Sequence, residues 1–334
     1  MKITSRILSV ILGLAMIAGS AVAVSANDDV APIADTSETT PVETAEETDA
    51  AAEEGTDVTA EEETDVTGET EEDLALVFVD IEGAEGNIAL TSGTFAKDGT
   101  VTVADVLKAV DEADDTLEIT GIDDGYITTV NGLTQGTFGG YDGWMYAVKY
   151  YTALEDGTIG MSIDVPMVGV GDYKIEDSCV IVLYYGDYDI PFAETAVDEN
   201  GMINLVTYTP VYAEDYSVSD FTKAPLAEGT FTFVPVTTDE EGNEVLGEAI
   251  VFTADENGVT TLSADMNELD EGIYYGYVGK QSDKITVGET EMTKALVVRY
   301  ADIYIVVKEE VVEPEPDTTE EDKVQLLLIG MMMF

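Results

Sequence analysis

The chain has 334 residues and carries 70 Asp plus Glu against 13 Lys plus Arg, a formal net charge of −57. Such a charge repels phosphate backbones, so nucleic-acid binding is excluded. The sequence contains no histidine and one cysteine. Histidine-based catalytic triads, histidine-ligated zinc or haem, and intrachain disulfides are therefore excluded as well.

Residues 1–26 have the features of an export signal. Lys2 and Arg6 precede an apolar run from Ile7 to Ala18, and small residues lead to a predicted cleavage site after Ala26. The run is short for a membrane span, which needs about 20 residues, so a retained membrane helix is the weaker alternative. Export without disulfides favours a secreted or cell-surface protein of a Gram-positive-type bacterium, with no transmembrane segment after signal cleavage.

Two further segments differ in composition from the rest of the chain. Residues 27–73 are rich in Asp, Glu and Thr and contain no Lys, Arg or aromatic residue, which predicts a disordered acidic linker. A specific acidic interaction tail is the alternative. Residues 309–334 combine an acidic spacer with an apolar end too short to span a bilayer as a helix. We expect a frayed tail there, with a truncated anchor as second choice.

A first domain is predicted at residues 74–192. It opens with an apolar, β-prone strand from Leu74 to Ile81. Thr102 and Asp105 then match a capping box, and apolar residues follow at helical spacing. This pattern predicts one short helix at 103–113.

The remaining pattern is strands and turns, which makes the predicted fold class mainly β. In the first domain, further strands are expected at 126–130, 144–151 and 180–185, with a hairpin turn at Asn131 and Gly132. A second domain is predicted at 196–308, with strands at 203–208, 229–236, 249–253, 259–263, 273–278 and 296–307. Several short strands without a helical period indicate an antiparallel β-sandwich, whereas the first domain is α+β.

The aromatic strip around the single tryptophan is the main candidate site. We select Tyr141, Trp144, Tyr146 and Tyr150 as candidate ligand-binding residues, because amphipathic rings stack on flat ligands. Strand alternation places Trp144, Tyr146 and Val148 on one face, joined by Tyr150 if no bulge intervenes. The alternative is that Trp144 packs into the sheet core, which leaves Tyr141 and Tyr150 as the exposed rings.

Other chemistry-bearing residues have ordinary interpretations. Cys179 lies in an apolar run and is expected to be a buried, inert thiol. Paired acids such as Asp123 with Asp124 are expected to be solvated turns rather than glycosidase dyads. The acidic turns at 198–201 and 255–258 favour hairpins over calcium loops. We therefore predict no catalytic residue, no metal ligand and no required cofactor.

Three stretches of the first domain resemble the C-terminal β-domain of transcobalamin and intrinsic factor, in its bacterial surface-protein version. These stretches are residues 101–109, 126–132 and 143–148, and residues 175–185 stand where that family has its final strand. The resemblance covers about residues 75–190. In the animal proteins this domain covers one face of cobalamin, so the resemblance implies a cobalamin-type corrinoid as ligand.

The second domain resembles the prealbumin-like or Ig-like repeats of Gram-positive adhesins, on residues 242–274. Many such repeats carry a Lys–Asn isopeptide bond. The lysine of their first strand has no counterpart in residues 230–234, so that bond is not predicted.

Together these features predict an exported, non-catalytic binding or display protein, expected to be a monomer. Its first domain would hold a small ligand, with a corrinoid suggested by the resemblance alone. The alternative is a structural or adhesive cell-surface module that binds host glycan or protein.

Overall fold

The computed structural model describes residues 74–153, 159–214, 216–240, 242 and 244–308. The predicted signal peptide, acidic linker and C-terminal tail lie outside these residues. The described fold is mainly β, with several antiparallel sheets, as the sequence predicts. No helix in this described part is long and apolar enough to cross a bilayer.

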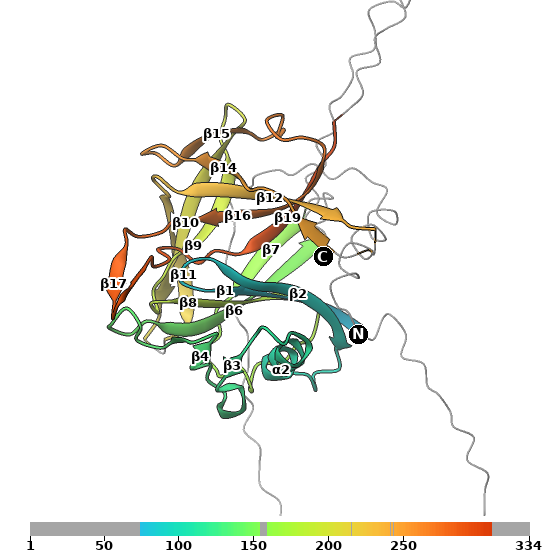
Figure 1. Ribbon diagram of the computed structural model, residues 1–334, viewed down its shortest axis with the longest axis vertical. Coiled ribbons are helices and arrows are strands. Elements are labelled where there is room, and N and C mark those ends of the chain that lie inside the picture. Colours follow the sequence, from blue (N-terminus) through green and yellow to red (C-terminus); the bar gives the residue numbers. More distant parts are fainter. Residues whose placement is uncertain (1–73, 154–158, 215, 241, 243, 309–334) are drawn as a thin grey trace, which may run out of the picture.

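A five-stranded mixed sheet, here called the N-terminal sheet, begins the fold (Figure 1). Its strands in spatial order are β2 (Asn87–Ala96), β1 (Leu74–Glu82), β8 (Cys179–Gly186), β6 (Gly143–Ala153) and β7 (Ile159–Asp164). The β1 and β8 pair is parallel, and the other pairs are antiparallel. Every residue of β8 is buried, so this central strand is covered on both faces.

The helix α2 (Val103–Ala113) covers one face of the N-terminal sheet and has the predicted bounds. Its capping box is present as expected. The Thr102 hydroxyl accepts a hydrogen bond from the Asp105 backbone N–H at 3.3 Å, and the Asp105 carboxylate accepts one from the Thr102 N–H at 2.9 Å. The apolar stripe of the helix, with Val106 and Leu107 fully buried, packs in one cluster with alternate residues of the sheet.

A small three-stranded sheet lies beside the helix. Its elements are β3 (Ile119–Thr120), the 3₁₀ turn η2 (Ile122–Asp124), β4 (Thr129–Val130) and β5 (Leu133–Thr134). The predicted hairpin turn joins β4 to β5, with positive φ of 47° at Asn131 and 81° at Gly132. The strand expected at 126–130 is limited to its last two residues, because Gly121 and Gly125 adopt left-handed conformations around the 3₁₀ turn.

Two further sheets follow in the second half of the chain. The middle sheet contains β13 (Glu244–Leu246), β12 (Thr230–Thr238), β16 (Gly272–Gly279) and β19 (Ala301–Val306), with β14 (Ile250–Thr253) also paired to β12. The outer sheet contains β11 (Val218–Pro225), β10 (Met202–Tyr212) and β15 (Val259–Ser263), with β9 (Phe192–Val197) also paired to β10. A hairpin of β17 (Ile285–Val287) and β18 (Thr290–Met292) projects from them.

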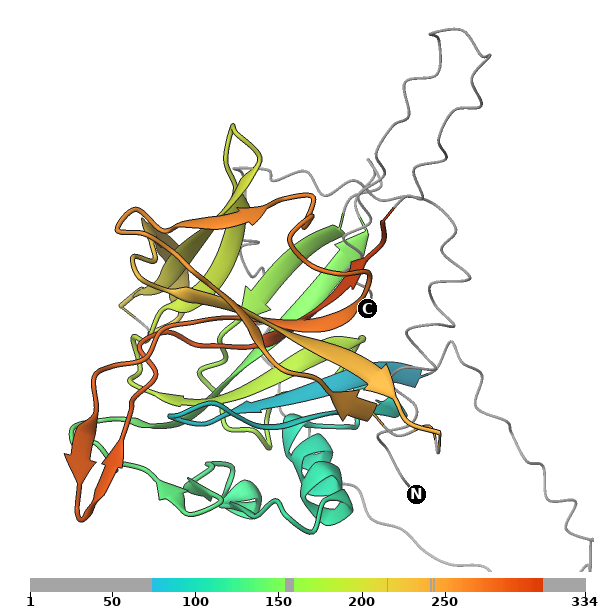
Figure 2. The same cartoon turned by 45° about the horizontal axis from the view of Figure 1, so that its top comes forward.

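The outer sheet contacts the N-terminal sheet through Phe192 of β9 and Phe221 of β11, which share a hydrophobic cluster with Val182 of β8. The middle sheet packs against both of these sheets (Figures 1 and 2). Alternation along β12 shows this, since Phe231 and Phe233 pack toward the outer sheet and Val236 packs toward the N-terminal sheet. On that second side, Phe78 and Val182 of the N-terminal sheet share a hydrophobic cluster with residues of β16 and β19. Residues assigned from sequence to two separate domains thus contribute to one core.

Candidate functional site

A cavity of about 380 Å³ opens where β6 begins and β8 ends. It is lined by aromatic and apolar residues from five segments of the chain, and no charged side chain is among the described residues that line it. Trp144 and Tyr146 of β6 and Leu183 and Tyr184 of β8 form its inner part. The outer part comes from residues 125–127, from the loop at 165–170, and from Tyr188, Tyr212, Ala213 and Tyr216.

Hydrogen bonds fix the two inner rings of β6. The indole Nε1 of Trp144 donates to the carbonyl of Leu133 at 2.8 Å, and the Tyr146 hydroxyl donates to the carbonyl of Val168 at 2.9 Å. Trp144 also packs edge to face with Tyr185, with ring centroids 5.5 Å apart. Both rings are buried from solvent and line the cavity. Burial raises the pKa of Tyr146, so its hydroxyl stays protonated.

The mouth of the cavity carries three exposed aromatic rings and one half-buried ring, here called the tyrosine rim: Tyr126, Tyr188 and Tyr216, with Tyr212 half-buried. Tyr126, Tyr188 and Tyr216 are 72%, 62% and 70% exposed, whereas most apolar side chains of this size are buried. Tyr212 is tied to its neighbour, because its hydroxyl donates to the Tyr188 carbonyl at 2.7 Å and the two rings lie 5.8 Å apart. Contiguous exposed apolar surface of this kind marks binding sites.

The structure brings two of the four predicted site residues to this cavity. Trp144 and Tyr146 both line the cavity. The Trp144 ring also packs in the sheet core, so the core and ligand-site interpretations of this residue are compatible. Tyr141 is 89% exposed and lies outside the cavity lining. Tyr150 does return to the face of Trp144, but its hydroxyl pairs with that of Tyr173 at 3.0 Å, away from the cavity.

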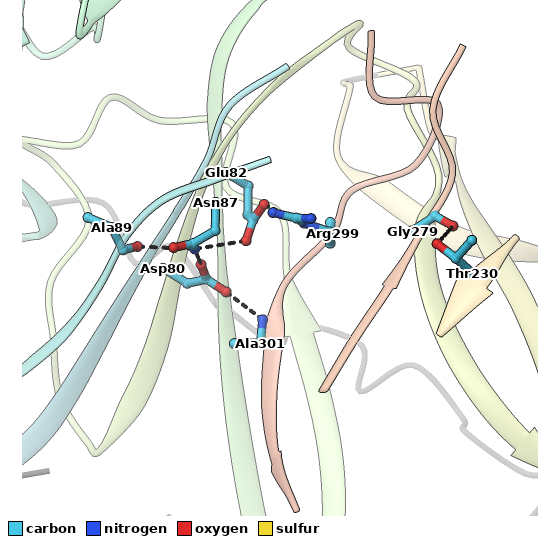
Figure 3. A network of polar contacts seen from close by, with 8 residues as sticks. All are labelled: Asp80, Glu82, Asn87, Ala89, Thr230, Gly279, Arg299 and Ala301. Carbon is cyan, nitrogen blue, oxygen red and sulfur yellow. Dashed lines mark hydrogen bonds and ion pairs between the residues drawn. The ribbon is translucent and has the colours of Figure 1, made fainter. Parts of the chain in front are cut away.

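A buried carboxylate pair joins the N-terminal sheet to the last part of the chain (Figure 3). The side-chain amide of Asn87 donates to Asp80 at 2.7 Å and to Glu82 at 2.9 Å. Arg299 binds Glu82 at 2.7 Å, and the Ala301 N–H donates to Asp80 at 2.6 Å. Burial raises the pKa of both carboxyls. None of these groups lines the aromatic cavity, so we interpret the network as a structural link between β1 and residues 299–301.

The acidic turns and the cysteine have structural surroundings. The carboxylates of Asp198 and Asp255 each accept backbone N–H groups two and four residues later, at 2.8 and 2.9 Å, and these bonds lower the pKa of both. Burial raises the pKa of the Cys179 thiol to about 12, as for a packed thiol. The described residues contain no group of three or more His, Cys, Asp or Glu side chains placed to hold a metal ion.

Sequence motifs would not have found the tyrosine rim. Tyr188 lies between β8 and β9, whereas Tyr212 ends β10 and Tyr216 lies in the turn that follows it. Their proximity depends on how the outer sheet packs against the N-terminal sheet. The chain matches no family model, no curated protein and no solved structure. The resemblances to the transcobalamin β-domain and to adhesin repeats therefore stay predictions.

Proposed function

We propose that the chain is an exported, non-catalytic binding protein whose aromatic cavity holds a small ligand. The observation that carries this proposal is the combination of a charge-free aromatic cavity and an exposed tyrosine rim on a chain of net charge −57. An apolar concavity on a strongly acidic chain is a place for a ligand to enter.

The chemistry of the cavity favours a neutral or cationic ligand with a flat apolar face. Tyrosine and tryptophan rings stack on such faces and attract cations through their negative ring faces. The field of the acidic chain repels anions. The volume of about 380 Å³ lies near the lower end of the range for small-molecule pockets, which suits a ligand of one or two rings. A corrinoid, which the resemblance suggests, would enter only by one edge and lie across the tyrosine rim.

Calorimetry on the full chain tests this proposal. The panel contains cobalamin, cobinamide, a phenyl glycoside and benzyltrimethylammonium, which represent the corrinoid, sugar and cationic classes. We expect saturable heat with at least one member. Removal of a rim ring in Tyr188→Ala or Tyr216→Ala is expected to weaken that binding about tenfold.

The matched control is Tyr141→Ala, which removes an even more exposed ring that lies outside the cavity lining. It is expected to leave binding unchanged. The absence of heat with every panel member, or equal losses in the rim and control variants, would contradict a ligand site at this cavity.

The second candidate is an adhesive module that binds host glycan or protein. The exposure of Tyr126, Tyr188 and Tyr216 favours it, because protruding rings can contact a macromolecule without using the cavity. The variant Ala213→Trp separates the two functions, because it adds bulk at the mouth of the cavity. Binding to a glycan array or to mucin that survives Ala213→Trp but is lost in Tyr216→Ala would support the adhesive function.

A further inference from the structure

Lys149 is the least exposed basic side chain of the described residues, and its surroundings are unusual. It extends from β6 on the face opposite Trp144, toward the middle sheet, and is 1% exposed. Its Nζ lies 3.1 Å from a carboxylate oxygen of Asp302 on β19, 153 residues later in the chain. Aromatic rings enclose the amine, since Nζ is 3.4 Å from the ring centroid of Tyr300 and 5.3 Å from that of Tyr151.

A second carboxyl group belongs to the same cluster. Glu194 of β9 accepts a hydrogen bond from the Tyr300 hydroxyl at 2.7 Å, and it interacts electrostatically with both Lys149 and Asp302. Desolvation raises the pKa of Glu194 to about 6, so this group exchanges a proton near neutral pH. The Tyr151 hydroxyl donates to the Asp302 oxygen that contacts the lysine, at 2.9 Å. The cluster thus holds an amine, an acid, a proton carrier and a hydrogen-bond donor.

We propose that Lys149 and Asp302 join in an intramolecular amide bond, with Glu194 as the proton relay. The ammonium first gives a proton to the Asp302 carboxylate, which leaves a neutral amine and a carboxylic acid. The Nζ lone pair then attacks Cγ of Asp302, and the C–N bond forms. Glu194 takes a further proton from nitrogen and returns it to the departing hydroxyl, so that the C–O bond breaks and water leaves. One ammonium and one carboxylate become one neutral amide and one water, without oxidation or reduction.

Three physical features favour this step. A buried ion pair is costly to keep desolvated, and conversion to an amide removes both charges. The fold also holds the two groups in contact, which replaces an encounter between molecules by a reaction within one molecule. The Tyr151 hydroxyl stabilises the negative charge that develops on the Asp302 oxygen during attack.

The bond would connect β6 of the N-terminal sheet to β19 of the middle sheet, across the shared hydrophobic cluster. Lys149 lies outside the part of the chain that resembles adhesin repeats, and the acceptor is an aspartate instead of an asparagine. Its effect would be a covalent tie between the two halves of the chain. Force or heat could then unfold each half, but the two halves would stay covalently linked at Lys149 and Asp302.

Tryptic peptide mapping of the denatured full chain tests the proposal without any variant. The amide blocks cleavage after Lys149, so residues 109–174 should appear as one peptide covalently joined to residues 300–308. The joined product should weigh one water less than the sum of its two parts. Complete cleavage after Lys149 together with a free peptide 300–308 would overturn the proposal.

Variants test the roles of the individual groups. Lys149→Arg keeps a cation but cannot form this amide. Its intact mass should therefore exceed that of the parent by one water in addition to the mass difference between arginine and lysine. Glu194→Gln preserves shape and should slow cross-linking at least about tenfold, because the amide side chain cannot relay a proton. Circular dichroism checks that both variants fold. Equally fast cross-linking in folded Glu194→Gln would overturn the relay role, and a peptide joined at another lysine would overturn the assignment to Lys149.

Discussion

Tyr185 shows how one buried hydroxyl organises the glycine-rich approach to Trp144. The hydroxyl accepts the Thr137 N–H at 3.0 Å and hydrogen-bonds the carboxylate of Asp142, which is fully buried. The same carboxylate accepts the Phe138 N–H at 3.1 Å. The glycines of this segment therefore turn around a polar centre, and the Tyr185 ring supports the tryptophan that lines the cavity.

We predict that Tyr185→Phe lowers the free energy of unfolding by about 1–3 kcal/mol, because the buried carboxylate of Asp142 loses a hydrogen-bond donor. Urea denaturation followed by tryptophan emission measures the change. Tyr141→Phe is the control, since its ring is 89% exposed, and it should stay within about 0.5 kcal/mol of the parent. Equal effects of the two substitutions would refute the role given to the Tyr185 hydroxyl.

At the scale of elements, the strongest local patterns were confirmed. The capping box and apolar stripe predicted helix 103–113, and alternation along β6 correctly separated Trp144 and Tyr146 from Lys149. The strand expected at 296–307 begins only at Ala301. Of its earlier residues, Val298 forms an isolated parallel bridge with Phe192 of the outer sheet. Local hydrophobicity alone does not distinguish such an isolated bridge from a strand.

Strands with little apolar pattern were missed. The outer strand β11 is mostly exposed along its length, so its sequence lacks the alternation that marks a half-buried strand. The edge strand β2 also lacks this alternation, because its residues are mostly of intermediate exposure. Both are held by backbone pairing to a well-marked neighbour, β10 and β1 respectively, which a sequence pattern does not display.

The hairpin between β4 and β5 allows a test of backbone conformation separate from packing. A Cβ at Gly132 or at Gly171 would contact nothing within 4 Å, but only Gly132 has a positive φ, of 81°. We predict that Gly132→Ala lowers the free energy of unfolding by about 1–2 kcal/mol through left-handed strain. Gly171→Ala should be neutral or stabilising by up to about 1 kcal/mol, because it restricts the unfolded chain. Thermal unfolding compares them, and equal losses would argue against the left-handed turn.

At the scale of the whole molecule, the contacts that decide the architecture join residues far apart in the chain. Lys149 contacts Asp302 across 153 residues, and Asp80 contacts Ala301 across 221. No spacing or composition signal indicates such pairs, and the same holds for the tyrosine rim. The sequence therefore predicted two β-rich halves and the residues of one inner wall of the cavity. The contacts between the sheets are seen only in the structure.

The shared core predicts that both halves unfold together. Separation would expose Phe78, Val180 and Val182 on one side and Tyr275 and Ile303 on the other. Thermal unfolding should therefore give one transition, with the same midpoint for Trp144 emission, which reports the first half, and for far-ultraviolet circular dichroism. Two midpoints separated by more than about 5 °C would contradict a single cooperative unit.

The raised pKa of Glu194 predicts a pH dependence of stability. Because the folded chain holds this proton more tightly, its contribution is complete below the ordinary pKa of 4.5 and is lost as pH rises through about 6. The free energy of unfolding should fall by at most about 2 kcal/mol from pH about 5 to pH about 8 through this group. The comparison is made between Lys149→Arg and Lys149→Arg with Glu194→Gln, which excludes the proposed amide. Identical pH slopes would contradict the shift.

Emission of Trp144 tests the central claim, a ligand site at the aromatic cavity, most directly. It is the only tryptophan of the chain and lines the cavity, so its fluorescence reports occupancy without a label. Titration with cobinamide, a phenyl glycoside and benzyltrimethylammonium should give a saturable change with at least one of them, weakened about tenfold in Tyr216→Ala and unchanged in Tyr141→Ala. Emission that responds to none of the three, or responds equally in Tyr216→Ala and the parent, would contradict the claim.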